Sequence, residues 1–234
     1  MKENIAIITA RGGSKRIPKK NIKEFCGKPM IAYAIQAAIE SGIYDTVMVS
    51  TDSEEIAEIA KKYGAEVPFL RSAKTSDDFA ITADVLKEVL DTYKELGLEY
   101  KYMTCIYPTA PFVTAEKLRH AVEELKSKKA SLVLPVTAFS YPPLRGYIMQ
   151  EGKLNMKWPE FYKSRSQDLE TIYHDAGQYY CYSVKEFMKM SGIITEEIVP
   201  IITDELEVQD IDNETDWKLA ELKYRLMTQN NAGF

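Results

Sequence analysis

Short apolar runs alternate with amphipathic stretches through the first half of the chain. Residues 4–9 form a continuous apolar run rich in isoleucine, which is typical of a strand buried on both faces of a parallel sheet. Residues 29–41 place apolar side chains at helical spacing and stop at Gly42, which predicts a helix. The same patterns predict strands at 46–51, 66–70, 102–107 and 131–136, and helices that begin after Asp52 or Ser53 and that span 82–96 and 115–126. This alternation predicts an α/β fold with a doubly wound, mostly parallel, Rossmann-like sheet.

The alternation breaks after Thr137, where turn-forming and large apolar residues follow one another without a clear period. We therefore expect residues 138–175 to be inserted into a single domain that spans residues 1–234. Residues 177–184 return to a strand-like composition, and residues 213–227 predict a closing amphipathic helix. The apolar contacts expected of that helix are Trp217, Ala220, Leu222 and Leu226.

Composition limits the class of protein. A chain of 234 residues with 45% hydrophobic content can bury a sizeable core. The net charge of -5 argues against a general nucleic-acid surface. Cys26, Cys105 and Cys181 are widely spaced and form no C-x-x-C pair, which favours reduced thiols and a cytoplasmic location over a disulfide framework or a zinc site. The apolar run before Arg11 is too short for a signal sequence or a membrane span, so we expect no membrane contact.

The loop after the first predicted strand, "ITARGGSKRIPKKN" at residues 8–21, is the first candidate site. In an open α/β sheet, ligands bind beyond the carboxyl ends of the strands, and this loop commonly holds phosphate. Glycines let backbone N–H groups approach an anion, and Arg11, Lys15 and Lys20 supply positive charge. Neither G-x-x-x-x-G-K-[ST] nor G-x-G-x-x-G is present in this stretch. From this stretch alone, a phosphate site and a solvated basic turn are both open.

A second candidate site is "QDIDNETDW" at residues 209–217. Asp210 and Asp212 are two residues apart, so in an extended segment they point to one side and could share a Mg²⁺ ion. Glu214 and Asp216 would equally suit the start of a helix, where acidic side chains are favoured. The spacing alone leaves both interpretations open.

Four blocks of the chain resemble, in the same order, blocks of the acylneuraminate cytidylyltransferases, which activate nine-carbon α-keto sugar acids. The blocks are "ARGGSKRIPKKN", "VSTDSEEIAEIAKKYGAEVPFLR", "YPTAPF" and "VQDIDNETDWKLAE". The resemblance covers most of the chain and implies a nucleotidyltransferase domain. It also implies a reaction in which CMP passes from CTP to the anomeric hydroxyl of the sugar acid and pyrophosphate is released.

The same resemblance implies roles for particular residues. Those that would bind the nucleotide are Ala10, Arg11, Gly12, Gly13, Ser14, Lys15, Asn21, Arg71 and Thr82. Arg11 and Lys20 would be catalytic, because phosphoryl transfer needs charge compensation more than covalent help. Asp210 and Asp212 would hold Mg²⁺ as the cofactor.

The sugar is inferred from a departure from the family pattern. Members that use N-acetylneuraminate typically carry a glutamine where this chain has Tyr107. Residues 164–180 and the block around Tyr107 are most similar to the branch that activates pseudaminic acid, and N-acetylneuraminate and legionaminate are the alternatives. The implied sugar contacts are Tyr107, Arg165, Gln167, His174, Asp175 and Tyr179. Strand packing is the alternative role for Tyr179, and His174 with Asp175 suits either a base or a structural hydrogen bond.

The large apolar side chains within residues 138–175 favour a dimer surface that also completes the sugar site. Family members exchange an arm of this kind, so the resemblance implies a homodimer. A hinged lid is the alternative.

Three other functions fit parts of the sequence: a nucleotidyltransferase with a different sugar or base, a phosphohydrolase, and a nucleotide-binding module without chemistry. A hydrolase of this kind would need an aspartate at the end of the first strand, where this chain has Thr9, Ala10 and Arg11. A binding module would not need Asp210 and Asp212 beside the phosphate loop.

Overall fold

The computed structural model describes residues 1–76 and 80–231. The strands are β1 (Lys2–Thr9), β2 (Glu24–Phe25), β3 (Lys28–Pro29), β4 (Thr46–Ser50), β5 (Tyr100–Ile106), β6 (Leu132–Ala138), β7 (Tyr147–Gln150), β8 (Lys153–Met156), β9 (Tyr173–Asp175), β10 (Tyr179–Ser183) and β11 (Ile198–Ile202). The α-helices are α1 (Met30–Ser41), α2 (Glu54–Lys62), α3 (Ala73–Ser76), α4 (Thr82–Glu95), α5 (Ala115–Ser127), α6 (Val184–Lys189) and α7 (Glu214–Asn231). The 3-10 helices are η1 (Pro143–Arg145), η2 (Pro159–Phe161), η3 (Ser166–Asp168) and η4 (Glu205–Glu207).

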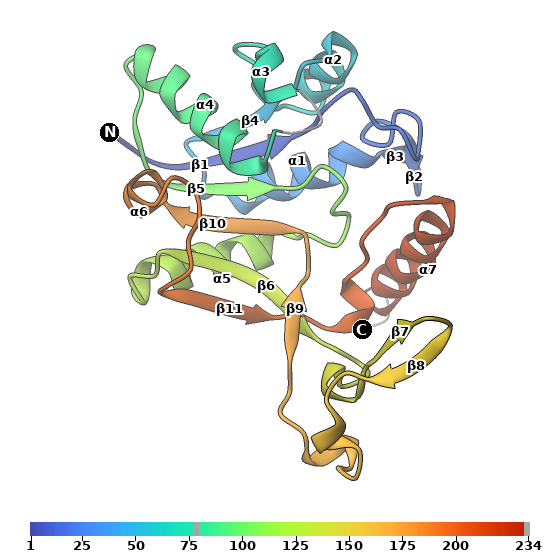
Figure 1. Cartoon of the computed structure of the whole chain (residues 1–234). Helices are drawn as coiled ribbons and strands as arrows, with labels where there is room; N and C mark the ends of the chain where they lie inside the picture. The colour runs from blue at the N-terminus through green and yellow to red at the C-terminus, as the bar shows by residue number, and fades with distance from the viewer. Residues whose placement is uncertain (77–79, 232–234) are drawn as a thin grey trace.

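One central sheet runs in the order β11-β6-β10-β5-β1-β4, with β9 added on β6 (Figure 1). β1 pairs in parallel with β4 on one side and with β5 on the other, and β11 pairs in parallel with β6. β10 lies between β5 and β6 and is antiparallel to both. The predicted doubly wound, mostly parallel fold is therefore confirmed, with one antiparallel strand inside it. Because the chain moves from one side of β1 to the other, the carboxyl end of β1 lies at the switch point where open α/β sheets bind ligands.

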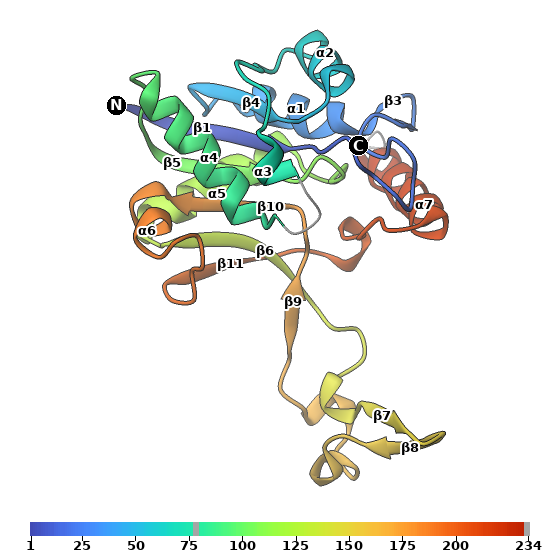
Figure 2. The ribbon, with the colours of Figure 1, turned by 45° about the horizontal axis from the view of Figure 1, so that its top comes forward.

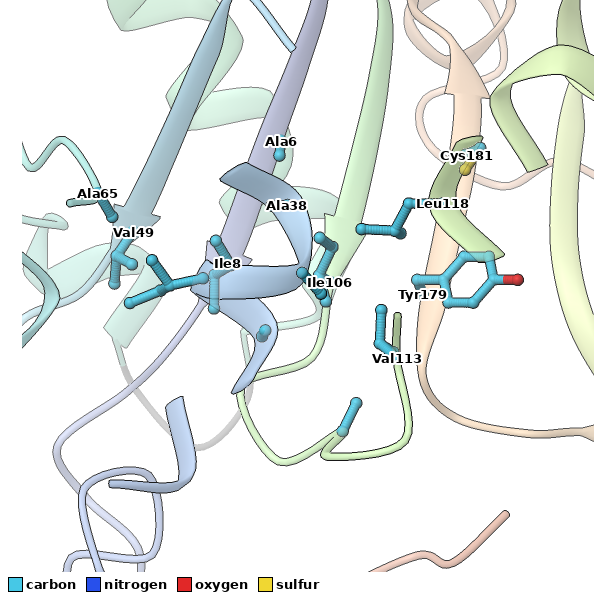
Figure 3. Close-up of a cluster of buried hydrophobic side chains, with 14 of the residues drawn as sticks. Ala6, Ile8, Ala38, Val49, Ala65, Ile106, Val113, Leu118, Tyr179 and Cys181 are labelled. Carbon is cyan, nitrogen blue, oxygen red and sulfur yellow. The ribbon is translucent and has the colours of Figure 1, made fainter. Parts of the chain in front are cut away.

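Alternate residues of β1 face two different hydrophobic clusters, as expected of a strand buried on both faces. Ala6 and Ile8 face a cluster that α1, α2 and α5 cover, and Figure 3 shows this cluster. Ile5 and Ile7 face a second cluster, which α4 and α6 cover. All four side chains are fully buried. The two layers of helices fix β1, and with it the loop that follows.

Short polar residues set the helix boundaries close to where the sequence predicts them. The Ser53 hydroxyl accepts a hydrogen bond from the Ile56 N–H at 3.4 Å and caps α2. Thr114 caps α5 in the same way, through the Lys117 N–H at 3.3 Å. Gly42 ends α1 in the left-handed conformation, with φ 67°.

Residues 139–172 leave the sheet after β6 and return in β9, and we call them the arm (Figure 2). The arm contains the β7–β8 hairpin and projects away from the sheet. Its apolar side chains are unusually accessible, with Tyr141 89% and Met149 72% exposed. The predicted insertion at 138–175 corresponds to this segment, with β9 as its return strand.

A third hydrophobic cluster joins α7 to the loop after β1. The Trp217 and Phe25 rings pack edge to face with centroids 5.5 Å apart. The Lys23 ammonium lies 4.6 Å from the Trp217 ring centroid and pairs with Glu214 at 2.7 Å. This cluster fixes the segment before α7, which contains Asp210 and Asp212, beside the loop.

The structure corrects three expectations. Residues 66–70 form no strand but only an isolated bridge between Glu66 and Met48, and Pro68 in this segment has no N–H to give to a ladder. The sequence pattern missed β11, whose interruption by Pro200 is tolerated at the edge of the sheet. Leu222 and Leu226, expected to pack, are 57% and 50% exposed. Trp217 and Ala220 are buried as expected.

None of the helices in residues 1–76 and 80–231 could cross a membrane, since none is both long and apolar enough.

Candidate active site

The carboxyl end of β1 opens into a cleft of about 530 Å³, a size typical of small-molecule sites. Its walls come from the loop after β1, the region of α3 and α4, the turn after β5 and the segment before α7. The predicted site residues that line it are Arg11, Ser14, Lys15, Lys20, Asn21, Arg71, Thr82, Tyr107 and Asp212. Among these predicted residues, four cations, a tyrosine and a carboxylate from distant parts of the chain thus share one cleft.

Hydrogen bonds hold the loop after β1 in place. The Gly12 N–H donates to the Asp52 carboxylate at 2.8 Å, and the Asn21 side chain donates to the Arg11 carbonyl at 2.8 Å. A Cβ at Gly12 would lie 3.2 Å from the Ser53 Cβ, so a larger residue would have to push the loop away from α2. Glycine suits the close approach of the loop to the start of α2 at this position, and its N–H is bonded to Asp52.

Arg71 presents a fixed cation at the cleft. Its guanidinium donates to Ser50 twice, from Nε to the hydroxyl at 3.1 Å and from Nη2 to the carbonyl at 2.6 Å. Only 9% of the residue is exposed. Burial lowers the pKa of Arg71, and the Asp52 and Glu88 carboxylates oppose that shift. A buried guanidinium stays protonated in proteins, so Arg71 is a positioned positive charge.

Lys20 lies among the two predicted metal carboxylates. Its ammonium donates to the Ile211 carbonyl at 2.5 Å. Burial lowers the pKa of Lys20, while Asp212 and then Asp210 raise it. Asp212 also pairs with the Arg16 guanidinium at 2.7 Å. This arrangement joins the loop to the acidic segment through alternating charges.

The donor set fits a magnesium ion that arrives with a nucleotide. Mg²⁺ takes oxygen ligands, commonly one or two protein carboxylates, with substrate phosphates and waters supplying the rest. Asp212 lines the cleft, and Asp210 is close enough to act on Lys20. Within residues 1–76 and 80–231, no group of three or more His, Cys, Asp or Glu side chains could hold a metal ion by itself. The assignment of Mg²⁺ to Asp210 and Asp212 stays a prediction.

Glu88 fastens the α3 region against α4 next to the cleft. Its carboxylate accepts hydrogen bonds from the Ser72 N–H at 2.8 Å, the Ser72 hydroxyl at 2.6 Å and the Thr75 hydroxyl at 2.6 Å. Burial of Glu88 raises its pKa, but these hydrogen bonds outweigh that effect and leave the pKa lowered. Thr75 follows Arg71 closely in the sequence, and both residues line the cleft.

Several predicted site residues lie outside the cleft lining. Ala10 is fully buried and packs in the core, and Gly12 and Gly13 belong to the loop without lining the cleft. In the arm, the Arg165 guanidinium pairs with Asp168 at 2.7 Å, and Gln167 lies in η3 between them.

The predicted sugar residues around β9 and β10 have mixed placements. His174 pairs with Thr137 in the sheet and packs on Phe139, with ring centroids 4.7 Å apart. The Asp175 carboxylate accepts hydrogen bonds from the Gly177 N–H at 2.7 Å and from the Tyr180 hydroxyl at 2.6 Å. Tyr179 is fully buried beside α5, as Figure 3 shows, so its assignment to the sugar site is not supported and the strand-packing alternative holds.

The sequence did not single out Tyr180, Arg16 or Thr75 as site residues. Strand alternation places Tyr180 on the opposite face from Tyr179, where its ring lies 5.3 Å from that of Tyr107. Arg16 and Thr75 line the cleft. Arg16 stands within the basic loop, so its charge was a usable signal, whereas nothing in the sequence distinguished Thr75.

A family model described as cytidylyltransferase matches residues 5–191. The chain belongs to the cytidylyltransferase family. It is 38% identical over 225 residues to a pseudaminic acid cytidylyltransferase from Campylobacter jejuni, covering 96% of this chain and 97% of the relative. It is 35% identical over 227 residues to a CMP-N,N'-diacetyllegionaminic acid synthase from Legionella pneumophila, covering 93% of this chain and 94% of the relative. The predicted resemblance to this enzyme family is therefore confirmed.

Solved structures of other cytidylyltransferases share the fold. The structure of CMP:2-keto-3-deoxy-manno-octonic acid synthetase complexed with CTP has a TM-score of 0.69 at 15% identity, over 97% of this chain and 99% of that one. A 4-diphosphocytidyl-2C-methyl-D-erythritol synthase from Anaerococcus prevotii has a TM-score of 0.67 at 15% identity, over 96% and 99%. At this identity the likeness supports the family fold and no residue roles.

Proposed function

We propose that this protein transfers CMP from CTP to the anomeric hydroxyl of pseudaminic acid, a nine-carbon α-keto sugar acid, and releases pyrophosphate. The observation that carries the proposal is a cation-lined cleft at the end of β1 in a chain similar, over nearly its whole length, to relatives named pseudaminic acid cytidylyltransferase. The cytoplasm is the proposed location, supported by three cysteines that are all free thiols.

The cations of the cleft compensate the negative charge of the triphosphate. Arg11, Lys15 and Lys20 on the loop, with Arg71 at the edge of the cleft, neutralise the phosphates and hold them in line with the attacking hydroxyl. A Mg²⁺ ion held by Asp210 and Asp212 would supply further charge compensation when bound.

The transfer itself is a displacement at the α-phosphorus. The sugar hydroxyl oxygen forms a bond to the α-phosphorus, the bond from that phosphorus to the pyrophosphate oxygen breaks, and the hydroxyl proton is lost to solvent or to a nearby base. The anomeric hydroxyl belongs to a hemiketal and loses its proton more readily than an ordinary alcohol. Lys20 and Arg11 stabilise the charge that develops on the phosphates.

Tyr107 supports pseudaminic acid as the sugar over N-acetylneuraminate. It lines the cleft on the turn after β5, at the position where N-acetylneuraminate users typically carry glutamine. The legionaminate alternative is kept open by the Legionella relative, which is almost as similar as the pseudaminic acid relatives.

The proposal includes a homodimer formed through the arm. Tyr141, Tyr147, Met149, Leu154 and Tyr162 are all more than half exposed in a single chain. Apolar side chains gathered in this way mark an association surface, and an isolated two-stranded hairpin is at best marginally stable in water. A second copy that covers the arm would bring Arg165 and Gln167 to a sugar site that a single chain leaves open.

Sedimentation tests the dimer. The intact protein should sediment as a dimer at micromolar concentration, and the double variant Trp158→Glu/Phe161→Glu should sediment as a monomer that loses affinity for the sugar acid before affinity for CTP. An intact protein that is monomeric and still fully active would refute the dimer without touching the nucleotide site.

The sugar assignment is tested by pyrophosphate release with CTP and Mg²⁺. Pseudaminic, legionaminic and N-acetylneuraminic acids are compared in parallel at equal concentration. The proposal expects the highest kcat/KM with pseudaminic acid. A higher value with either other acid would replace the substrate and keep the reaction.

A further inference from the structure

One of the two carboxylates assigned to the divalent cation is paired with a cation of the chain itself. Nη2 of the Arg16 guanidinium lies 2.7 Å from Oδ1 of Asp212. Both residues line the cleft at the end of β1. Among the described residues of the lining, Asp212 is the only carboxylate, and it faces five cations, which are Arg11, Lys15, Arg16, Lys20 and Arg71.

The backbone on both sides of this pair is fixed. Ile17, which follows Arg16, is 1% exposed and packs in the cluster that joins α7 to the loop. The Asp212 N–H donates to the Asp216 carboxylate at 2.9 Å, and the carbonyl just before it accepts from the Lys20 ammonium at 2.5 Å. The stems of Arg16 and Asp212 therefore stay in place, whichever partners their charged groups take.

The charged groups of the pair are accessible, unlike the backbone that carries them. The Arg16 side chain is 69% exposed and the Asp212 side chain 38%. An ion pair as exposed as this one contributes little, because solvent screens the attraction. It can therefore be exchanged for a stronger partner. A triphosphate is such a partner for Arg16, because a guanidinium binds phosphate oxygens through two parallel hydrogen bonds.

We infer that Arg16 exchanges the Asp212 carboxylate for the triphosphate when CTP binds, and that this exchange makes the binding of a divalent cation at Asp212 depend on the nucleotide. The inference rests on the proposed function and deepens it, because it names the side chain that regulates the cation site. A guanidinium on Asp212 opposes a divalent cation there, since both are positive and both compete for one carboxylate.

The donor set agrees with this dependence. Within the described parts of the chain, 1–76 and 80–231, no group of three or more His, Cys, Asp or Glu side chains could hold a metal ion. Asp210 and Asp212 would therefore need phosphate oxygens to complete the ligands of a hard cation. The arriving triphosphate would supply those oxygens and draw Arg16 away from Asp212 in the same event.

The exchange predicts that one substitution has opposite effects on two ligands. Without its guanidinium partner, Asp212 is open to a divalent cation, so Arg16→Gln should bind that cation more tightly in the protein alone. The same substitution takes a positive charge from the triphosphate, so CTP should bind more weakly. A residue with a purely structural role would weaken both ligands or neither.

Two titrations without the sugar acid measure these effects separately. The first follows Mn²⁺, as a substitute for Mg²⁺, through the electron paramagnetic resonance signal of the free ion, with no nucleotide present. Arg16→Gln should lower the Kd for Mn²⁺ about fivefold, the upper end for an exposed ion pair. The second follows CTP by calorimetry with EDTA present. Arg16→Gln should raise the Kd for CTP about tenfold, on the scale of one charge-assisted hydrogen bond.

Lys19→Gln is the matched control, because it removes the same charge from the same loop. Lys19 pairs with Glu55 at 2.7 Å and does not line the cleft, so both Kd values should stay within about twofold of the wild type. Adding Asp212→Asn to Arg16→Gln should abolish the gain in Mn²⁺ affinity, because the gain depends on that carboxylate.

The outcomes separate this inference from the proposed function. If the wild type binds CTP but Arg16→Gln behaves like Lys19→Gln, or shifts both Kd values in the same direction, the inference is overturned and the function stands. A gain in Mn²⁺ affinity that survives Asp212→Asn would place the cation elsewhere and would also overturn it. If the wild type binds no CTP, the proposed function fails, and the inference fails with it.

Discussion

Replacing Lys20 by methionine removes a charge and a donor from the cleft and keeps the length of the side chain. The Lys20 ammonium donates to the Ile211 carbonyl at 2.5 Å, and Asp212 and Asp210 oppose the lowering of its pKa by burial. Lys20 is therefore a positive charge whose position is fixed before a nucleotide binds. If the cleft binds CTP as proposed, the Lys20 ammonium stabilises the phosphates as negative charge develops on them.

The size of the effect follows from the place of the charge. Two unit charges about 4 Å apart attract by about 4 kcal/mol at an effective dielectric constant of about 20. Part of this attraction is already present when CTP is bound, so we expect a loss of about 3 kcal/mol in the transition state, or about a hundredfold in kcat/KM. The Ile211 carbonyl also loses its donor, which should lower the free energy of unfolding by about 1 kcal/mol.

The assay is pyrophosphate release at saturating sugar acid and varied CTP, with thermal unfolding measured on the same samples. Lys19→Met is the matched control, because Lys19 precedes Lys20 on the same loop but pairs with Glu55 at 2.7 Å on the surface and does not line the cleft. The control should keep kcat/KM within about threefold, as a surface ion pair contributes little. A folded Lys20→Met variant that retains more than about a fifth of the wild-type kcat/KM would refute the role of the loop as the triphosphate site.

Three further predictions follow from the same structure. Replacing Asp210 and Asp212 together by asparagine should abolish Mg²⁺-dependent turnover with an unchanged circular dichroism spectrum, and unchanged metal dependence would move the metal elsewhere. Trp217→Ala should lower the free energy of unfolding in urea by about 3 to 5 kcal/mol, because Trp217 is 4% exposed and packs on Phe25; a loss under 1 kcal/mol would contradict its role in fixing α7. Since the pKa of the Glu88 carboxyl is lowered in the folded protein, its stabilisation is present above its unfolded pKa and is lost as the pH falls through the folded pKa. Glu88→Gln should therefore be less stable than the wild type at pH 7, with the difference in Tm shrinking as the pH falls below the unfolded pKa of about 4.3, and a difference that does not shrink below that pH would contradict the hydrogen-bonded carboxylate.

The part of the fold that depends on local pattern could be predicted from the sequence. The isoleucine run of β1 and the caps Ser53 and Thr114 are local signals, and the structure places strand and helix ends within two residues of the predicted ones at these places. The interruption by Pro68 was also readable, because proline cannot join a ladder from the inside. The antiparallel direction of β10 could not be predicted, since it depends on the path of the arm between β6 and β9.

The candidate site was predictable where it follows a strand and not where it depends on packing between distant segments. Arg11 and Lys20 follow β1 directly, so the fold class alone places them at the cleft. The neighbourhood of Asp212 depends on the packing of α7 against β2 and α1, which no local pattern encodes. Between Tyr179 and Tyr180, alternation shows that they face opposite sides of the sheet but not which side holds the cleft.

The central claim is that this cleft transfers the CMP part of CTP, and the fate of a labelled phosphorus tests it most directly. CTP labelled at the α-phosphorus is incubated with the enzyme, Mg²⁺ and pseudaminic acid, beside CTP labelled at the γ-phosphorus. The account predicts that the α-label appears in a sugar nucleotide and the γ-label in pyrophosphate, in equal amounts and only when the sugar acid is present. An α-label found in free CMP, a γ-label found in inorganic phosphate without added pyrophosphatase, or turnover without the sugar acid would contradict nucleotidyl transfer.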